Sequence, residues 1–463
     1  MTIQGAAEAL RARRVSAVEL TNSALERIEH LNSRLNAFIT VTGDYALQRA
    51  RQADAELATG RDRGPLHGVP IAVKDLFHMR GVRTTSGSKI FENLRPGHDA
   101  AVVEKLESAG AVILGKLNMH ELAYGITSAN PHFGPVRNPW DTERSPGGSS
   151  GGSGAAVAAG IVYSAMGSDT GGSVRIPAAF CGTVGLKPTY GRVSRYGSLP
   201  LGYTLDHMGP LTRSVRDAAA VLNAIAGRDD RDETSSRRPV VDFVPEEGCT
   251  IRGLRIGFPE NVFFEHLHPD VESAVRGAVA RAASLGATVK PVTVPDVEAL
   301  NSVGRVILLS EASAVMEPYM ADRRRFGSDV LALLDQGRLV SATDYINAQR
   351  LRRKMIAEFN RLWTDVNCLV CPTTPNTAPK IGESTVRLGG RDEDVRLAST
   401  RLVRGINVLG YPAISLPCGL SGSGLPIGLQ IIGAAFDEST ILRVAAALED
   451  GGVAIPPCPL SGL

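Results

Sequence analysis

Apolar runs alternate along the chain with segments of helical periodicity, as in proteins built from a sheet between layers of helices. The runs at 69–73 and 111–117 lack the polar alternation of a half-exposed strand, so they indicate strands buried on both faces. Ser16 opens a capping box at the start of one helix, a second helix is predicted over 44–59, and Asp99 is the expected N-cap of a third. This pattern predicts an α/β fold with a central sheet covered by helices on both faces.

Two clusters of serine and glycine lie within residues 145–173, which read SPGGSSGGSGAAVAAGIVYSAMGSDTGGS. A flexible linker would be polar throughout, whereas an apolar segment of small residues joins these clusters. The segment is therefore expected to cross a packed interior and to carry its serines with it. Glycine lets backbone N–H groups converge on one point, so the pattern indicates a catalytic site with a serine nucleophile.

Lys74 ends the apolar run of LHGVPIAVKDLF at 66–77 and is the candidate base. A lysine is rarely buried without a partner, and burial favours its neutral form, which can accept a proton near pH 7. The alternative is a lysine at the end of a strand whose ammonium group reaches solvent or pairs with Asp75. The serine and glycine clusters favour the base.

These residues resemble the amidase signature family, which has a Ser-cisSer-Lys triad. The matching motifs are GVPIAVKD at 68–75, GGSSGGSG at 147–154 and GSDTGGSVRIPAAFCG at 167–182, and the resemblance extends from about residue 17 to about residue 448. It implies that Lys74 is the base, Ser149 the bridging serine and Ser173 the nucleophile. It also implies a cis peptide bond between Gly148 and Ser149, and a mixed twisted sheet within a single large domain.

The resemblance assigns further roles around this triad. Ser149 would relay the proton of Ser173 to neutral Lys74, and an acyl-enzyme would form on Ser173. The backbone N–H groups of Thr170, Gly171 and Gly172 would form the oxyanion hole, and Ser150 would support Lys74 by a hydrogen bond. Tyr124 lies in a stretch that borders the acyl pocket in relatives, or it is an ordinary core aromatic. No cofactor and no metal are expected.

We expect one amidase domain over residues 1–463. The polar, turn-rich stretch at 227–250 marks the exit from the catalytic core. The expected parts are N-terminal helices at 1–65, the catalytic signature core at 66–226, a variable and largely helical rim at 227–360, and a C-terminal return to the sheet at 361–463.

Three other kinds of site fit the residues less well. Residues 147–151 match G-x-S-x-G, but no apolar strand precedes them, and the last histidine, His268, comes too early for that class of hydrolase. A phosphate-binding loop would need G-x-x-x-x-G-K-[ST], which is absent from the sequence. Cys368 and Cys371 have C-x-x-C spacing inside an apolar run, which indicates buried thiols rather than a zinc site. We expect His207 and Arg175 to be structural.

Composition narrows the range of partners and compartments. With a net charge of +2 and no long basic run, the chain is not expected to bind nucleic acid directly, although a partner could supply that contact. Six irregularly spaced cysteines fit a reducing compartment, and neither a signal sequence nor a run of 18 apolar residues is present. We expect a cytoplasmic protein that acts on a small-molecule amide, makes no membrane contact, and is compatible with a homodimer.

The resemblance leaves two functions open. The first is an amidohydrolase that cleaves a carboxamide, anilide or carbamate C–N bond. The alternative is the glutaminase A subunit of a tRNA-dependent amidotransferase, in which Arg352 and Asp437 would contact glutamine. The sequence RDEDVR at 391–396 differs from the D-P-[LT]-x-M-Y pattern of those glutaminases and favours the first function.

Overall fold

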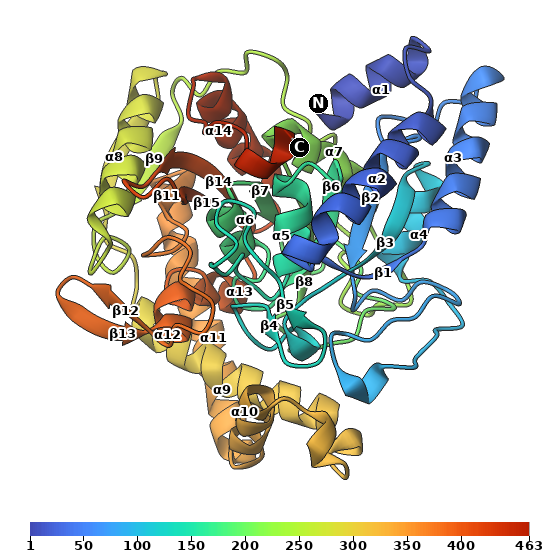
Figure 1. Cartoon of the computed structure of the whole chain (residues 1–463). Coiled ribbons are helices and arrows are strands. Elements are labelled where there is room, and N and C mark those ends of the chain that lie inside the picture. Colours follow the sequence, from blue (N-terminus) through green and yellow to red (C-terminus); the bar gives the residue numbers. More distant parts are fainter. Residues whose placement is uncertain (463) are drawn as a thin grey trace.

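One 11-stranded mixed sheet runs through the computed structural model, which describes residues 1–462 (Figure 1). Across the sheet the strands are β1 (Phe38–Val41), β3 (Val112–Leu117), β2 (Pro70–Lys74), β6 (Ser164–Asp169), β8 (His207–Thr212), β7 (Val184–Lys187), β14 (Ala413–Leu420), β15 (Pro426–Gly433), β11 (Cys368–Pro372), β9 (Arg255–Pro259) and β10 (Thr288–Val292). Two small hairpins pair β4 (Ala129–Asn130) with β5 (Gly134–Pro135) and β12 (Thr385–Leu388) with β13 (Arg391–Asp394).

Parallel and antiparallel pairs are combined in this sheet. Strand β2 runs parallel to β3 and β6, and β9 runs parallel to β10 and β11. The remaining neighbours are antiparallel; β6 and β8, for example, stay in register from Ser164 opposite Thr212 to Asp169 opposite His207. Every residue of β2, β3, β6, β8 and β15 is buried, which explains why β2 and β3 lack the polar alternation of a half-exposed strand.

Helices cover both faces of the sheet, as predicted, and the α/β class of the fold is confirmed. Helices α2, α5 and α6 pack on strands of its centre, and a second group consisting of α4, α7, α14 and α8 forms the other layer. The helices are α1 (Ile3–Arg11), α2 (Ala17–Leu35), α3 (Gly43–Ala58), α4 (Ala101–Ser108), α5 (Gly151–Ala158), α6 (Arg175–Cys181), α7 (Val215–Ile225), α8 (Pro269–Ser284), α9 (Val297–Met316), α10 (Ser328–Arg338), α11 (Ala342–Asn360), α12 (Val395–Thr400), α13 (Arg404–Leu409) and α14 (Glu438–Asp450).

Local signals in the sequence account for several of these boundaries. The Ser16 side chain accepts a hydrogen bond from the Glu19 N–H, and the Glu19 side chain accepts one from the Ser16 N–H, so the capping box at the start of α2 is confirmed. Asp99 is not the N-cap of α4, because its carboxylate accepts the Arg80 N–H at 2.6 Å and the cap position falls on Ala100.

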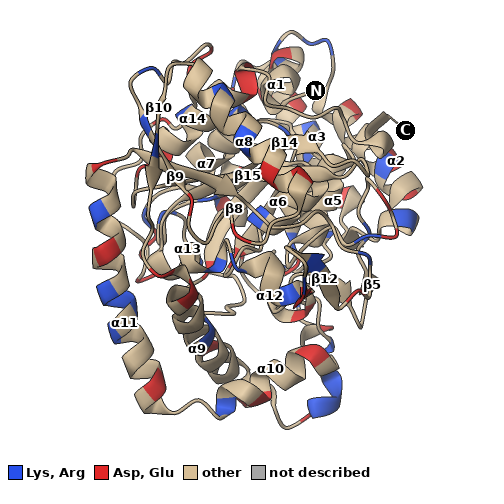
Figure 2. Ribbon diagram, turned by 90° about the vertical axis from the view of Figure 1, so that its left-hand side faces the viewer, with Lys and Arg blue, Asp and Glu red and all other residues tan. Residues whose placement is uncertain are grey.

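Helices α9, α10 and α11 project from the lower side of the sheet (Figure 1). Along α11 (Figure 2) the basic residues lie together, between an acidic residue near each end of the helix: Asp344, then Arg350, Arg352, Arg353 and Lys354, then Glu358. Within residues 1–462, no helix has the length and apolar character needed to cross a bilayer.

Candidate active site

The expected triad lies where strand ends meet helix starts. Lys74 is the last residue of β2, and its parallel neighbour β6 ends nearby at Asp169. Helix α5 begins directly after Ser150, and α6 begins two residues after Ser173. Because parallel strands end at the same edge of a sheet, this connectivity brings the lysine and both serine clusters together.

Lys74 is fully buried, and its partners are hydroxyl groups. Its Nζ donates to Ser149 Oγ at 2.7 Å and to Ser168 Oγ at 2.8 Å. Burial lowers the pKa of Lys74 to about 7, and the through-space attraction of Asp206 and Asp169 opposes this shift. Asp75 forms its ion pair with Lys116 instead, at 3.2 Å, so the alternative pairing of Lys74 with Asp75 does not occur.

The bridging and nucleophilic serines differ in exposure. Ser149 is 0% exposed and follows a cis peptide bond from Gly148, whereas Ser173 is 6% exposed. The Ser150 N–H donates to the Ser173 carbonyl at 3.3 Å, which joins the two clusters. Among residues 1–462 no hydrogen bond links Ser149 Oγ with Ser173 Oγ, although catalytic contacts of this kind often tighten only when substrate binds.

Ser150 supports Lys74 through a residue that sequence reasoning missed. Its Oγ donates to the Ser168 carbonyl at 3.2 Å and accepts the Ser168 N–H at 3.3 Å. Ser168 in turn presents its own Oγ to Lys74. Ser168 could have been singled out from the sequence, because it belongs to the third motif and lies one residue before the end of the buried strand β6.

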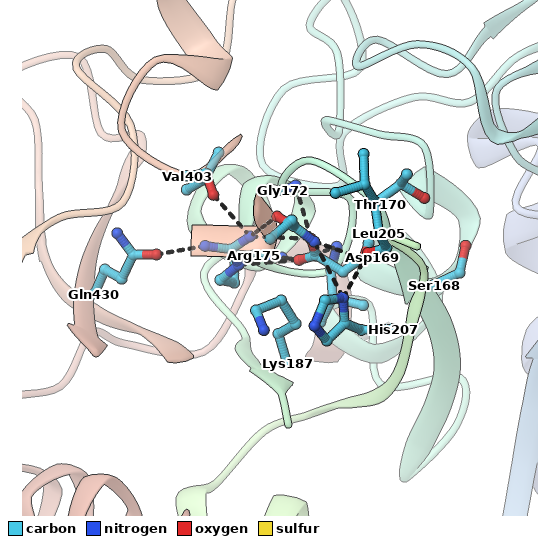
Figure 3. Close-up of polar contacts among 12 residues, drawn as sticks. Ser168, Asp169, Thr170, Gly172, Arg175, Lys187, Leu205, His207, Val403 and Gln430 are labelled. Carbon is cyan, nitrogen blue, oxygen red and sulfur yellow. Dashed lines mark hydrogen bonds and ion pairs between the residues drawn. The ribbon is translucent and has the colours of Figure 1, made fainter. Parts of the chain in front are cut away.

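Asp169 holds the loop that carries Ser173. Its Oδ1 accepts the Gly172 N–H at 2.7 Å, and its Oδ2 accepts the Val174 N–H at 3.1 Å (Figure 3). The Gly172 N–H, expected as an oxyanion donor, is therefore engaged by a carboxylate in this structure. Gly172 has φ +118°, and a Cβ there would lie 2.4 Å from Val403 Cγ2, so the loop requires glycine.

Arg175 and His207 are structural, as expected. The Arg175 guanidinium is fully buried, pairs with Asp169 at 3.0 Å and donates to Gln430 Oε1 at 2.7 Å (Figure 3). His207 Nδ1 lies 2.6 Å from the Leu205 carbonyl oxygen, and burial holds its pKa well below the usual range. Neither side chain is available to the substrate.

Tyr124 is nearly fully buried and also lines a cavity of about 230 Å³. Burial raises the pKa of its hydroxyl to about 12. The same cavity is lined by Arg305, Arg396 and Arg404, which sequence reasoning did not single out.

Other predicted residues have structural partners. Arg352 donates to the Val408 carbonyl at 2.7 Å and to Thr204 Oγ1 at 2.9 Å, and Asp437 is the N-cap of α14. Cys368 and Cys371 are buried on β11 as free thiols. In the part of the chain that the structure describes, no group of three or more His, Cys, Asp or Glu side chains is arranged to hold a metal ion.

Comparison with known proteins identifies the family. The sequence profile described as Amidase matches residues 19–442. The chain belongs to this family. The resemblance to amidase signature enzymes that the three motifs indicated is confirmed, and with it the single α/β domain.

Several members of the amidase family are close relatives in sequence or structure. The chain is 43% identical, over 97% of its length and 96% of the relative's, to the A subunit of the glutamyl-tRNA(Gln) amidotransferase of Anaeromyxobacter sp. (strain K). It matches the structure of the corresponding A subunit from Thermotoga maritima with a TM-score of 0.82 and 36% identity, covering 99% of this chain and 97% of that one.

A further solved structure is described as a vestigial protein complex that reveals the evolutionary origins of an s-triazine catabolic enzyme. Its chain has a TM-score of 0.95 and 38% identity to this one, with 98% of this chain and 99% of that chain covered.

These relatives correct the expected partners. The sequence suggested a small-molecule amide, no direct contact with nucleic acid, and no protein partner other than a second copy of the chain. The relatives are named as subunits of an enzyme that acts on a tRNA, and one of the structures is a protein complex. The expected set of partners is wrong because the net charge and basic runs of one chain do not show which other subunits its relatives work with.

Proposed function

We propose that this chain hydrolyses carboxamide C–N bonds through an acyl-enzyme on Ser173, as the glutamine-hydrolysing A subunit of a tRNA-dependent amidotransferase. The observation that carries the proposal is the hydrogen bond between Lys74 and Ser149 in a fully buried site. A lysine with a pKa of about 7 is partly neutral at physiological pH and can accept a proton from Ser149.

The proposed mechanism uses a proton relay. Ser173 Oγ attacks the amide carbon, its proton passes to Ser149 Oγ, and Ser149 gives its own proton to Lys74 Nζ. The lysine ammonium then returns a proton along the same path to the departing nitrogen. The resulting ester on Ser173 is hydrolysed by water.

The negative charge on the carbonyl oxygen needs donors near Ser173. The backbone N–H groups of Thr170, Gly171 and Ser173 are the proposed donors, since that of Gly172 binds Asp169. Asp169 also fixes the Val174 N–H and Arg175, so the loop is held before substrate arrives.

The names of the relatives support the role of an amidotransferase glutaminase over an enzyme that acts alone. The similarity to the A subunit from Anaeromyxobacter covers nearly the whole length of both chains. The proposal places the protein in the cytoplasm, where aminoacyl-tRNA is made.

The test is ammonia release from glutamine and from simple alkyl amides by the wild type, Ser173→Ala and Ser273→Ala. Ser273 is an exposed serine on α8 and serves as the matched control. We expect Ser173→Ala to lower kcat by about 10³-fold or more, because the acyl-enzyme cannot form, and Ser273→Ala to behave as the wild type. Retention of more than about a thousandth of the activity in Ser173→Ala would contradict the mechanism.

A further inference from the structure

Arginine side chains from three separate helices line the cavity beside Tyr124. Arg305 comes from α9, Arg396 from α12 and Arg404 from α13, and together with Tyr124 and Asp394 they define what we call the arginine cavity. Its volume of about 230 Å³ is below the range of pockets for drug-sized ligands, so it suits a small group.

None of the three arginines forms an ion pair within the described residues. Arg305 donates to Gln336 Oε1 at 3.3 Å and Arg396 to the Tyr124 carbonyl at 3.4 Å, both neutral acceptors. Arg404 makes no hydrogen bond there, and burial together with its arginine neighbours lowers its pKa to about 10. Arg396 and Arg404 are half-buried and Arg305 is exposed, so three guanidinium groups without an acid partner line one cavity, an arrangement that favours an anion there.

The nearby carboxylates are already engaged. Asp394 lines the cavity and caps α12, where its Oδ1 accepts the Leu397 N–H at 2.9 Å. Asp329 lies 3.0 Å from His120 Nε2. With three arginines and one acid in its lining, the arginine cavity keeps an excess of positive charge.

The cavity adjoins the loop of the nucleophile. A Cβ at Gly171 would lie 3.7 Å from Arg404 Cγ, and Gly171 is two residues before Ser173. The residue preceding Arg404, Val403, accepts a hydrogen bond from Arg175 through its carbonyl at 3.1 Å. Arg404 is thus held against the segment on which the acyl group would form.

We propose that the arginine cavity binds a carboxylate of the amide substrate, so that the enzyme selects short amides whose acyl part carries an acid group. The proposal rests on the amide hydrolysis assigned to Ser173 and names its substrate class. A carboxylate matches the planar fork of a guanidinium, and Arg404 has donors to spare. Glutamine belongs to this class through its α-carboxylate, and the half-amides of dicarboxylic acids belong to it without an ammonium group.

The test compares glutaramate with pentanamide, which have the same chain length and differ in the terminal carboxylate. We expect the wild type to show a kcat/KM for glutaramate at least about tenfold higher than for pentanamide, mainly through KM. Arg404→Gln should lower this ratio about tenfold, and the ratio does not depend on how much protein folds. Arg324→Gln, at an arginine whose side chain is 95% exposed, is the matched control and should keep the ratio.

Direct binding of glutarate separates this proposal from the proposed function. Calorimetry should show that glutarate binds the wild type and binds Arg404→Gln at least about tenfold more weakly. If no amide is hydrolysed while glutarate still binds through Arg404, the cavity assignment stands and the hydrolase assignment fails. If both amides are cleaved equally and glutarate does not bind, or if Arg404→Gln changes neither measurement, the cavity assignment is overturned.

Discussion

The Lys74 amine is surrounded by hydroxyl groups, while the two carboxylates that attract it, Asp169 and Asp206, act through space. Asp169 uses its oxygens to hold the loop of Ser173 and Arg175, and Asp206 accepts from Thr170 and from backbone N–H groups. A direct carboxylate partner would stabilise the ammonium and remove the base. The Lys74 amine can lose its proton near pH 7 because the two acids of the site, Asp169 and Asp206, accept hydrogen bonds from other residues.

This balance predicts the pH dependence of catalysis. Since burial lowers the pKa of Lys74 to about 7, the fraction of neutral base rises with pH, and kcat/KM should increase through that value and level off above it. The measurement is kcat/KM between pH 5 and 9. Lys74→Arg, which stays protonated, should be inactive throughout this range. A flat wild-type profile would show that another group is the base.

Among single residues, the sequence predicted those that belong to contiguous motifs. Lys74, Ser149 and Ser173 each stand in a local pattern of glycine, serine and apolar residues. Arg305, Arg396 and Arg404 lie in unrelated segments without a shared pattern, and only the packing of three helices brings them together. Nor did spacing reveal that Asp169 would capture the Gly172 N–H, because that depends on the conformation of the loop.

Helix α5 shows how composition reflects packing at the scale of one element. Its sequence GGSGAAVA is buried along its entire length, as expected for a segment that crosses the interior. A Cβ at Gly152 would lie 2.4 Å from the Asn118 carbonyl oxygen and 2.5 Å from that of Ala37. The helix therefore lies directly against the backbone next to β3 and β1, and the Ser149–Ser150 pair at its start is positioned by that contact.

Two glycine substitutions test this contact. Gly152→Ala should destabilise the fold by about 1–3 kcal/mol, because backbone atoms cannot move aside. Gly277→Ala on α8, where nothing lies within 4 Å of the added Cβ, should instead stabilise by up to about 1 kcal/mol. Urea unfolding midpoints of both variants provide the measurement. Equal midpoints would refute the close approach of α5.

The sequence predicted where single strands and helices begin and end, but it did not predict the order of the strands in the sheet. The strands at Pro70–Lys74 and Val112–Leu117 and the helix at Gly43–Ala58 agree with the predicted ranges to within two residues. The position of β15 between β14 and β11, or of β10 at the sheet edge, depends on pairing between distant segments, which periodicity does not encode. Asp99 was misassigned because the Arg80 N–H competed for its carboxylate.

For the whole molecule, the decisive information came from relatives. The net charge is close to balanced, and the outer helices carry residues of both signs (Figure 2). The proposed assembly with the partners of a tRNA-dependent enzyme therefore rests on the names of the relatives and not on the charge of this chain.

Coexpression with the other amidotransferase subunits of the same organism tests the assembly. We expect a stable complex by size-exclusion chromatography with light scattering, and ammonia release from glutamine that increases about tenfold when glutamyl-tRNA is added. The increase is expected because a ligand bound to one subunit can shift the conformation of another. A chain that stays alone and hydrolyses amides at an unchanged rate would argue for an independent amidase.

The segments that build the arginine cavity are separate from those that carry the lysine and the serines. Helices α9, α12 and α13 come late in the chain, whereas the reacting groups lie on β2 and in the loops before α5 and α6. If the proposed function holds, substitutions of the cavity arginines can change which amide binds while Lys74, Ser149 and Ser173 stay in place. Asn407 of α13, however, must be kept because it holds Asp169. Such a division makes the scaffold adaptable, both in natural divergence and in laboratory selection.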